Sequence, residues 1–531
     1  MPSLNGLLPL PISTLSNTYL AMFISLMAPL LLILVLFHRV IKRSVNPVNW
    51  SFLGMLPSLV ANTPHLHHWT TNLAANNDGN YEFKGPWLSG MNIFFTADPV
   101  NTNHIFSLNR QNYVKGSKIT DILDILGDGL IIANDESWLH QRRRAHTLIS
   151  SNYFRAFLAA SARKKVEEGL LPLLNHVAST GKVVDLQDVF LRYTFDVSCV
   201  TLFGVDTNCL SLGLPTIAFA AATDDVTEGL LYRHFLPMKW WKLLRWLRVG
   251  REKKFAAAWQ VLDEFIYQQI SKKKEEIKRK ESNKEPSPTF DLLSSYIEDP
   301  MEAKMTSDYD TFLRDTVINK IIAGRDTSAI SLTWFIYMLT KHRDVEAKIL
   351  DELRAIAPST DALNDDQLVI FDVKDLNKLV YLSAAIYESL RLFPPVPFNH
   401  RTAKYSDELP SGHRVQPGAL IISSVYAMGR MEKVWGKDCN EFKPERWITE
   451  GGTVRHEATY KFSVFGTGPR MCVGKDTALT MVKIAAAALV YNFEVEMVEG
   501  HVVEPKLSVL LTMKNGLKVK VKTRKCMPAV D

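Results

Sequence analysis

One cysteine lies in a glycine-rich segment near the C-terminal end of the chain, FGTGPRMCVG (465–474). Its thiolate could act as a nucleophile or as a metal ligand. A nucleophile needs a positioned base, and the sequence assigns none. A zinc site needs further Cys or His ligands, and none lies within ten residues of Cys472. A single thiolate fits a haem iron, whose four in-plane ligands come from the porphyrin.

The residues around this cysteine suit the approach of a flat ring. Gly468 and Gly474 let the backbone turn tightly and come close to a planar group. Arg470 can pair with a carboxylate at the edge of the ring. A helix is expected from residue 475 to 489, and its N-terminal N–H groups would stabilise a thiolate at Cys472.

A second chemical pattern is AGRDT (323–327), within a segment of helical periodicity. Ala323 and Gly324 are small enough to open a groove beside the helix. Asp326 and Thr327 place an acid next to an alcohol, and such a pair can manage protons over a metal.

The pattern FxxGxRxCxG resembles the haem-binding loop of the cytochrome P450 superfamily. It is matched at Phe465, Gly468, Arg470, Cys472 and Gly474, and further motifs follow the order of that family. The resemblance implies a mainly α fold with a minor β-sheet, forming a single large haem-thiolate monooxygenase domain. It also implies haem b (iron protoporphyrin IX) as cofactor, Cys472 as the axial iron ligand and Phe465 beside the thiolate.

The same resemblance gives Asp326 and Thr327 the role of proton delivery during oxygen activation. Relatives that rearrange peroxides commonly lose this motif, so its presence favours an enzyme that uses O2. Rival interpretations need other features: a haem carrier has no need of the acid and alcohol, and a nucleotide enzyme needs GxGxxG, whereas GDGLIIA (127–133) lacks the third glycine.

Two further motifs are implied to hold the haem propionates. Trp138 and Arg142 have the spacing of the family's propionate-binding helix. PPVPFNHR (394–401) ends in His400 and Arg401, and one of these two is expected to be a further propionate partner. The sequence does not decide between them.

A structural network is also implied. Glu388 and Arg391 are three residues apart and share one face of an expected helix. Arg446, in FKPERW (442–447), is expected to complete a Glu388–Arg391–Arg446 network that supports the haem-binding core.

The elements that must position these residues are mostly helical. Periodicity predicts helices at 161–176, 259–280, 312–341 and 376–392, and short strands at 81–83, 93–95, 414–415, 420–424 and 517–522. The first two strands are expected to form a hairpin.

The N-terminal region predicts a membrane anchor. Residues 19–37 are uncharged and long enough to cross a bilayer, and basic residues follow them but do not precede them. We therefore expect a lumenal segment at 1–18, a transmembrane helix at 19–37, a basic, proline-containing connector at 38–57 and a catalytic domain at 58–531. This arrangement predicts a single-pass protein of the endoplasmic reticulum whose catalytic domain is cytoplasmic.

Composition excludes several other classes. Hydrophobic residues make up 47% of the 531 residues and charged residues 22%, which is unlike a disordered chain or a multi-span membrane protein. The five cysteines show no regular spacing, so a disulfide scaffold is not expected. A net charge of +6 suits an acidic protein partner or membrane lipid and is too diffuse to indicate nucleic acid.

The expected partners are O2, a small hydrophobic substrate and NADPH–cytochrome P450 reductase, since no flavin or nicotinamide segment is recognisable. Segments at 241–254, 409–415 and 428–447 resemble a plant group of fatty-acid and mid-chain alkane hydroxylases that also contains noroxomaritidine synthases. The resemblance implies hydroxylation of a long-chain alkane or fatty acid. The alternative, at nearly equal weight, is oxidative coupling of a norbelladine-type phenol in Amaryllidaceae alkaloid biosynthesis.

Overall fold

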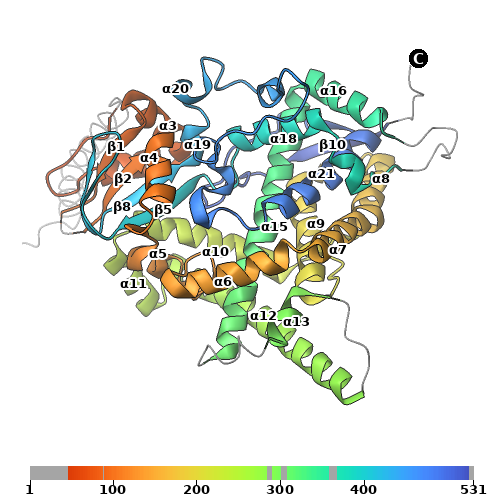
Figure 1. The fold of residues 1–531 in the computed structure, drawn as a ribbon, viewed down its shortest axis with the longest axis horizontal. Coiled ribbons are helices and arrows are strands. Elements are labelled where there is room, and N and C mark those ends of the chain that lie inside the picture. Colours follow the sequence, from red (N-terminus) through yellow and green to blue (C-terminus); the bar gives the residue numbers. More distant parts are fainter. Residues whose placement is uncertain (1–45, 88, 284–289, 300–307, 358–367, 525–531) are drawn as a thin grey trace, which may run out of the picture.

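A long central helix, α15 (Tyr309–Lys341), organises the fold (Figure 1). Its first turn is capped by the Asp308 carboxylate, which accepts a hydrogen bond from the Thr311 backbone N–H at 3.1 Å. Buried residues lie on all sides of it, as expected for a helix inside a domain rather than on its surface. This computed structural model describes residues 46–524 except 88, 284–289, 300–307 and 358–367.

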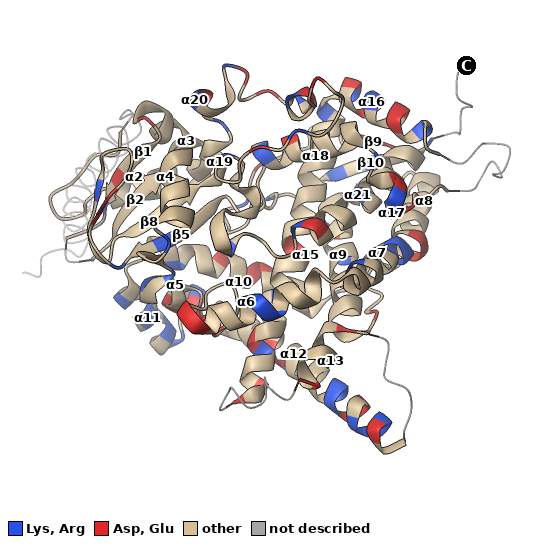
Figure 2. Cartoon of the chain, viewed as in Figure 1, with Lys and Arg blue, Asp and Glu red and all other residues tan. Residues whose placement is uncertain are grey.

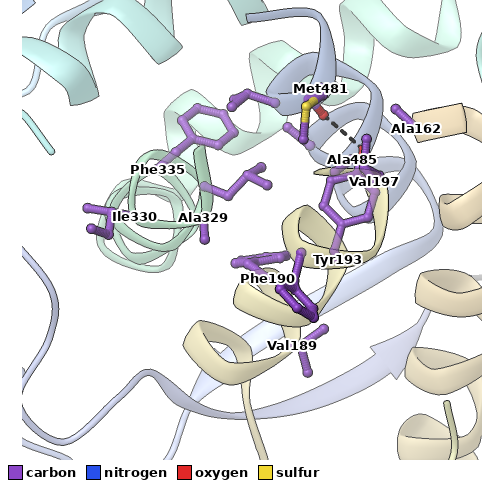
Figure 3. Packing of buried hydrophobic residues seen from close by; sticks show 14 of the residues in the cluster. Ala162, Val189, Phe190, Tyr193, Val197, Ala329, Ile330, Phe335, Met481 and Ala485 are labelled. Atoms are coloured by element: carbon purple, nitrogen blue, oxygen red, sulfur yellow. Dashed lines mark hydrogen bonds between the residues drawn. The ribbon is translucent and has the colours of Figure 1, made fainter. Parts of the chain in front are cut away.

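Two further helices pack on α15 and form the centre of the hydrophobic core. They are α9 (Leu186–Phe203) and α21 (Lys475–Asn492). Figure 3 shows Tyr193 of α9 beside Met481 of α21, where the tyrosine hydroxyl donates to the Met481 carbonyl at 3.3 Å. Because α21 directly follows Cys472, this packing fixes the position of the cysteine loop against α15.

The other helices surround this centre. Within the described residues the α-helices are α2 (Leu56–Asn62), α3 (Leu66–Asn76), α4 (Pro99–Asn103), α5 (Gly116–Ile122), α6 (Asp135–Ile149), α7 (Asn152–Lys165), α8 (Leu171–Thr180), α10 (Ala218–Phe235), α11 (Met238–Leu247), α12 (Gly250–Asn283), α13 (Leu292–Ile297), α16 (Arg343–Arg354), α17 (Val373–Leu376), α18 (Val380–Leu392), α19 (Val425–Met428) and α20 (Glu432–Trp435).

The sheets are small, so the predicted fold class, mainly α with a minor β component, is confirmed. One five-stranded sheet has the order β1 (Asn80–Lys84), β2 (Asn92–Thr96), β8 (Leu420–Ser424), β5 (Phe398–Ala403) and β3 (Tyr113–Val114). A second sheet orders β4 (Val184–Asp185), β10 (Lys518–Thr523) and β9 (Phe493–Met497), and β6 (Asp407–Glu408) pairs with β7 (Arg414–Val415).

Most predicted elements are present, with shifted ends. The predicted hairpin is confirmed, because β1 and β2 pair antiparallel with Tyr81 opposite Phe95. The helix predicted at 161–176 is divided between α7 and α8 by a π-helical turn, Val166–Leu170. The connector was expected to end at Pro57, yet α2 begins one residue earlier, because the first turn of a helix tolerates a proline.

The predicted membrane anchor at 19–37 and the lumenal segment before it lie outside the described residues. Among the residues that the structure does describe, no helix is both long enough and apolar enough to span a bilayer.

A buried carboxylate, Glu388 of α18, connects the core to the segment before the cysteine loop. One of its oxygens, Oε2, accepts hydrogen bonds from Arg391 Nε at 2.8 Å and Trp447 Nε1 at 2.8 Å, and the other, Oε1, accepts from Arg391 Nη2 at 2.8 Å. The backbone N–H of Lys443 donates to it at 3.0 Å, and Arg446 Nε approaches at 3.4 Å. The structure therefore brings together the three residues of the predicted network.

Arg391 extends the same network along the chain. It donates to the carbonyl oxygens of Cys439 at 2.6 Å and Glu441 at 3.0 Å, and also to that of Gly429. Both Glu388 and Arg391 are inaccessible to solvent. Removing one partner would leave the other charge buried and unpaired, which costs more than losing an exposed ion pair.

We therefore expect Glu388→Ala to lower the free energy of unfolding by about 3–5 kcal/mol, measured by urea denaturation. The control is Asp351→Ala. Asp351 also pairs with an arginine three residues away, Arg354, but on the exposed face of α16. That change is expected to cost about 0.5 kcal/mol or less. Equal effects of the two substitutions would contradict a stabilising role for the buried network.

Candidate active site

A cavity of about 620 Å³ lies between α15, the cysteine loop and the edge of the five-stranded sheet. Most of its wall is apolar. The predicted site residues that line it are Trp138, Arg142, Thr327, His400, Arg401, Phe465, Arg470, Cys472 and Gly474. Gly468 and Asp326 lie behind the wall. The structure thus brings residues from four separate parts of the chain to one space.

Cys472 opens onto this cavity at the start of α21. Its backbone N–H donates to the Phe465 carbonyl at 2.7 Å, which closes the loop. Burial raises the pKa of the thiol, while the Gly474 backbone N–H and the charges of Arg142 and Lys475 act in the opposite direction. These donors and cations would favour a thiolate once an iron binds it.

Gly468 is required by a close approach of two backbones. Its φ is +69°, and a Cβ there would lie 2.2 Å from the carbonyl oxygen of Phe106. Phe106 belongs to a π-helical turn, His104–Leu108, that follows α4. The glycine predicted from sequence to allow a tight turn therefore also lets the loop pack against this turn.

Four cations meet at one end of the cavity: Lys115, Arg142, Arg401 and Arg470. None of them forms an ion pair with an acid among the described residues. Burial lowers the pKa of Arg401 to about 9 and of Arg470 to about 10, and it lowers the pKa of Lys115 well below its ordinary value. Their mutual repulsion adds to this effect.

Unpaired buried cations are costly and indicate a missing anion. A haem carries two carboxylates at one edge, and the thiol that could bind its iron lines the same cavity. The residues present therefore fit a haem, with Cys472 on the iron and the four cations at the propionates.

Trp138 and Arg470 hold each other in place. The guanidinium of Arg470 lies over the Trp138 ring at 4.5 Å from its centroid and donates to the Ala133 carbonyl at 2.6 Å. Trp138 is buried on α6, and Arg142 lies one turn further along that helix. The Trp138–Arg142 motif thus supplies one cation, Arg142, directly and positions a second, Arg470, through the Trp138 ring.

Lys115 was missed in the sequence analysis. It lies in the turn between β3 and α5, where no motif marks it, and its backbone N–H donates to Asn134 at 3.0 Å. A lysine in a short polar turn is normally exposed, so only the three-dimensional contact with Arg401 and Arg470 identifies it.

The structure separates the two neighbours that the sequence left undecided. Arg401 lies over the Phe106 ring at 4.5 Å and is buried within the cluster of cations. His400 instead stacks on His234 of α10, with 4.9 Å between the ring centroids. This placement favours Arg401 over His400 as the residue near a propionate.

On α15 the alcohol and the acid point in different directions. Thr327 lines the cavity, and its hydroxyl donates to the Ala323 carbonyl at 2.6 Å. Asp326 is buried behind it in an ion pair with Arg325. Burial raises the pKa of Asp326, and its second oxygen has no hydrogen-bond partner among the described residues.

The glycines of the GDGLIIA segment have a structural role. The side chain of Asn319 on α15 donates to the Leu126 carbonyl at 2.8 Å and accepts from the Ile131 N–H at 3.1 Å. A Cβ at Gly129 would lie 1.9 Å from Asn319 Nδ2. The segment therefore connects α15 to α6.

Comparison with known proteins identifies the family of this chain. Residues 47–521 match the model of the family described as Cytochrome P450. The chain belongs to the cytochrome P450 family. As a P450 it is an oxidoreductase of the monooxygenase type, with a haem-thiolate iron, O2, a small-molecule substrate and a separate redox partner.

Individual relatives match over nearly the whole P450 chain. A noroxomaritidine synthase of Narcissus aff. pseudonarcissus MK-2014 is 40% identical, covering 96% of this chain and 98% of its own. Alkane hydroxylase MAH1 of Arabidopsis thaliana is 41% identical over 89% of this chain and 92% of its own. Cytochrome P450 86B1 of the same plant is 40% identical, over 90% and 85%. The plant group suggested by the sequence motifs is confirmed.

Lys115→Met tests the cation cluster. We expect the haem-free protein to become more stable, because a buried unpaired charge is removed. We expect haem to leave about 10–100-fold faster, because a charge-assisted hydrogen bond is lost. Thermal denaturation of the haem-free protein and haem transfer to an excess acceptor measure the two effects.

The control is Lys118→Met, one turn along α5, where the lysine reaches the Gly90 carbonyl outside the cavity. It should leave haem release unchanged. Equal haem release from the two variants would show that Lys115 does not face a propionate.

Proposed function

We propose that this P450 hydroxylates an extended aliphatic substrate, a long-chain alkane or fatty acid. The main support is the cavity itself, whose wall is predominantly apolar and includes both Cys472 and Thr327. An alkyl chain gains about 0.8 kcal/mol for each CH₂ group transferred from water into such a space. The 41% identity to an alkane hydroxylase supports the same conclusion.

The cofactor is proposed to be haem b. Cys472 would hold its iron, Phe465 would flank the thiolate, and Trp138, Arg142, Arg401 and Arg470 would hold its carboxylate edge, with Lys115 beside them. Gly468 and Gly474 would let the loop reach the ring. When bound, this group activates O2, so that one oxygen atom enters a C–H bond and the other leaves as water after uptake of two electrons and two protons.

The protein's own part in that chemistry is the supply of protons. We propose that Asp326, whose pKa is raised by burial, takes up protons from solvent and holds them behind the cavity wall. Thr327, on the cavity wall, would pass them on through its hydroxyl. The apolar wall would exclude bulk water and so limit unproductive loss of electrons.

A second candidate is oxidative phenol coupling. The noroxomaritidine synthases match almost the full length of this chain, and two neutral histidines interrupt the apolar cavity wall at the position where a polar ring substituent could bind. The two reactions use the same haem and proton-handling residues, so these residues do not distinguish them.

Electrons are proposed to come from NADPH–cytochrome P450 reductase at the endoplasmic reticulum membrane.

The apolar segment at 19–37 would anchor the chain in that membrane. The surface of α11 supports a second contact with lipid: Trp240 and Trp246 are 68% and 77% exposed beside Lys239, Lys242 and Arg245 (Figure 2). Washing microsomes with carbonate tests the anchor. The full chain should stay with the membrane, and a chain without residues 1–37 should be washed off.

Thr327→Ala is expected to slow product formation about 10–100-fold, because a proton-relaying hydroxyl is removed. NADPH consumption should persist, with its electrons appearing as hydrogen peroxide. Product, NADPH and peroxide are measured together in the reductase-coupled assay. Thr333→Ala is the control, because Thr333 makes the same bond to the carbonyl four residues earlier, at 2.8 Å, away from the cavity. Equal coupling in the two variants would refute the role of Thr327.

Product analysis separates the two candidate reactions. Microsomes containing the protein and reductase are supplied with heavy-isotope O2 and with a long-chain alkane, a fatty acid or a norbelladine-type phenol. Hydroxylation predicts an aliphatic alcohol that carries one labelled oxygen atom. A coupled phenol without labelled oxygen, and no alcohol, would reject the aliphatic proposal in favour of the second candidate.

A further inference from the structure

Two histidines stack face to face in the wall of the cavity. His234 lies in the last turn of α10, and His400 lies in β5. Their ring centroids are 4.9 Å apart and their planes differ by 23°. They come from segments more than 160 residues apart in the sequence, so only the fold brings them together.

Their surroundings are apolar. Leu230 and Leu231 of α10 line the cavity on one side of the pair, and Ile422 lies directly opposite His400 on the neighbouring strand. The nearby charges are Lys115 and Arg401, which belong to the cation cluster.

The hydrogen bonds of His234 fix where its proton lies. Nδ1 is 2.8 Å from the Leu230 carbonyl, which can only accept, so Nδ1 carries the hydrogen. Nε2 is then an acceptor, and it is buried without a hydrogen-bond partner among the described residues. Burial lowers the pKa of His234, which keeps the ring neutral at neutral pH.

His400 is also neutral and also lacks a side-chain partner. Burial lowers its pKa well below the ordinary value, and the neighbouring His234, Lys115 and Arg401 lower it further. Only its carbonyl oxygen takes part in a side-chain hydrogen bond within the described chain, accepting from Arg401 at 2.7 Å. Unlike an unpaired lysine, a neutral imidazole can both donate and accept.

We propose that the His234–His400 pair recognises a hydroxyl group on an otherwise apolar substrate. This rests on the proposed function only in taking the cavity as the substrate site. A buried imidazole without a partner costs free energy that a hydroxyl would recover. A plain hydrocarbon would leave both rings without this gain, so within the proposed aliphatic class the pair favours a chain that bears a hydroxyl over a bare alkane.

A hydroxyl of this kind could belong to a long-chain alcohol or to a phenol. The chemistry of recognition is the same, because either hydroxyl can donate to a bare imidazole nitrogen. In the first case the enzyme would oxidise a chain that already bears oxygen, and in the second it would hold a phenol ring.

The test compares ligands that differ only in the hydroxyl hydrogen. Purified holoenzyme is titrated with a long-chain secondary alcohol and its methyl ether, and with a norbelladine-type phenol and its methyl ether. The spectral shift of the resting haem reports binding without turnover. We expect one hydroxyl ligand to bind about 10–100-fold more tightly than its ether. The pair that shows this preference identifies the source of the hydroxyl.

His400→Phe keeps the stacked ring but removes its nitrogens. It should abolish the preference for hydroxyl over ether while leaving ether binding and haem content at the wild-type level. His67→Phe is the control, because His67 is also buried and stacked, on Phe398 at 5.3 Å, but does not line the cavity. It should keep the preference. If the His400→Phe variant fails to take up haem but the His234→Phe variant takes it up normally, His400 serves the haem and the proposal is wrong.

Two outcomes overturn the proposal and leave the proposed function standing. One is equal binding of hydroxyl and ether ligands to the wild-type protein. The other is a preference that survives both His400→Phe and His234→Phe. If none of the ligands shifts the haem spectrum, the cavity binds neither hydroxyl class and this inference is wrong, whereas the proposed function is decided separately by product analysis with the alkane and the fatty acid.

Discussion

The site depends on buried positive charge that the chain does not neutralise. Lys115, Arg142, Arg401 and Arg470 come from four different elements and converge on one end of the cavity without an ion pair to a carboxylate among the described residues; Asp135 acts on Arg470 only from beyond ion-pair distance. Charges of one sign placed together in a low-dielectric space repel one another, and burial removes their hydration. The haem-free fold is stable only if the rest of the structure offsets the free energy of burying these unpaired charges. Binding of an anionic group would remove that penalty.

That stability comes from the packing around α15 and from fully paired charges elsewhere. Glu388 and Arg391 are buried more deeply than any of the cavity cations, yet every strong donor and acceptor of that network has a partner. The contrast between the two clusters is informative. Satisfied buried charges serve the fold, whereas unsatisfied ones facing a cavity mark a ligand site. The same comparison distinguishes the paired Glu388 from Asp326, whose second oxygen has no partner among the described residues.

Sequence reasoning found the parts of the site that are local. The cysteine loop, the acid–alcohol pair and the Trp138–Arg142 spacing each lie within one short segment, so their residue types could be interpreted directly. The long helices were also predictable, because their periodicity is repeated over many turns. The ends of helices were less predictable. Helix boundaries change at the π-helical turn Val166–Leu170 and at the proline in the first turn of α2, although the hydrophobic pattern does not change there.

What the sequence could not give were contacts between distant segments. Lys115 lies in an ordinary turn, and nothing in its neighbourhood predicts burial beside Arg401. The choice between His400 and Arg401 was undecidable for the same reason. Adjacent residues of a strand point to opposite faces of the sheet, so His400 and Arg401 cannot both face the cation cluster. Which one faces the cations depends on the pairing of β5 with β8, where His400 lies opposite Ile422.

This alternation also explains how one strand can serve two purposes. Arg401 contributes to the cation cluster, whereas His400 meets α10 through His234. A shift of β5 by a single residue would exchange the two side chains, putting a cation among apolar groups and a neutral ring among the cations. The register of a small sheet thus couples the position of the cofactor to the polarity of the substrate cavity. The residues that α10 presents to this strand therefore set the polarity of the cavity wall without contributing to the cation cluster.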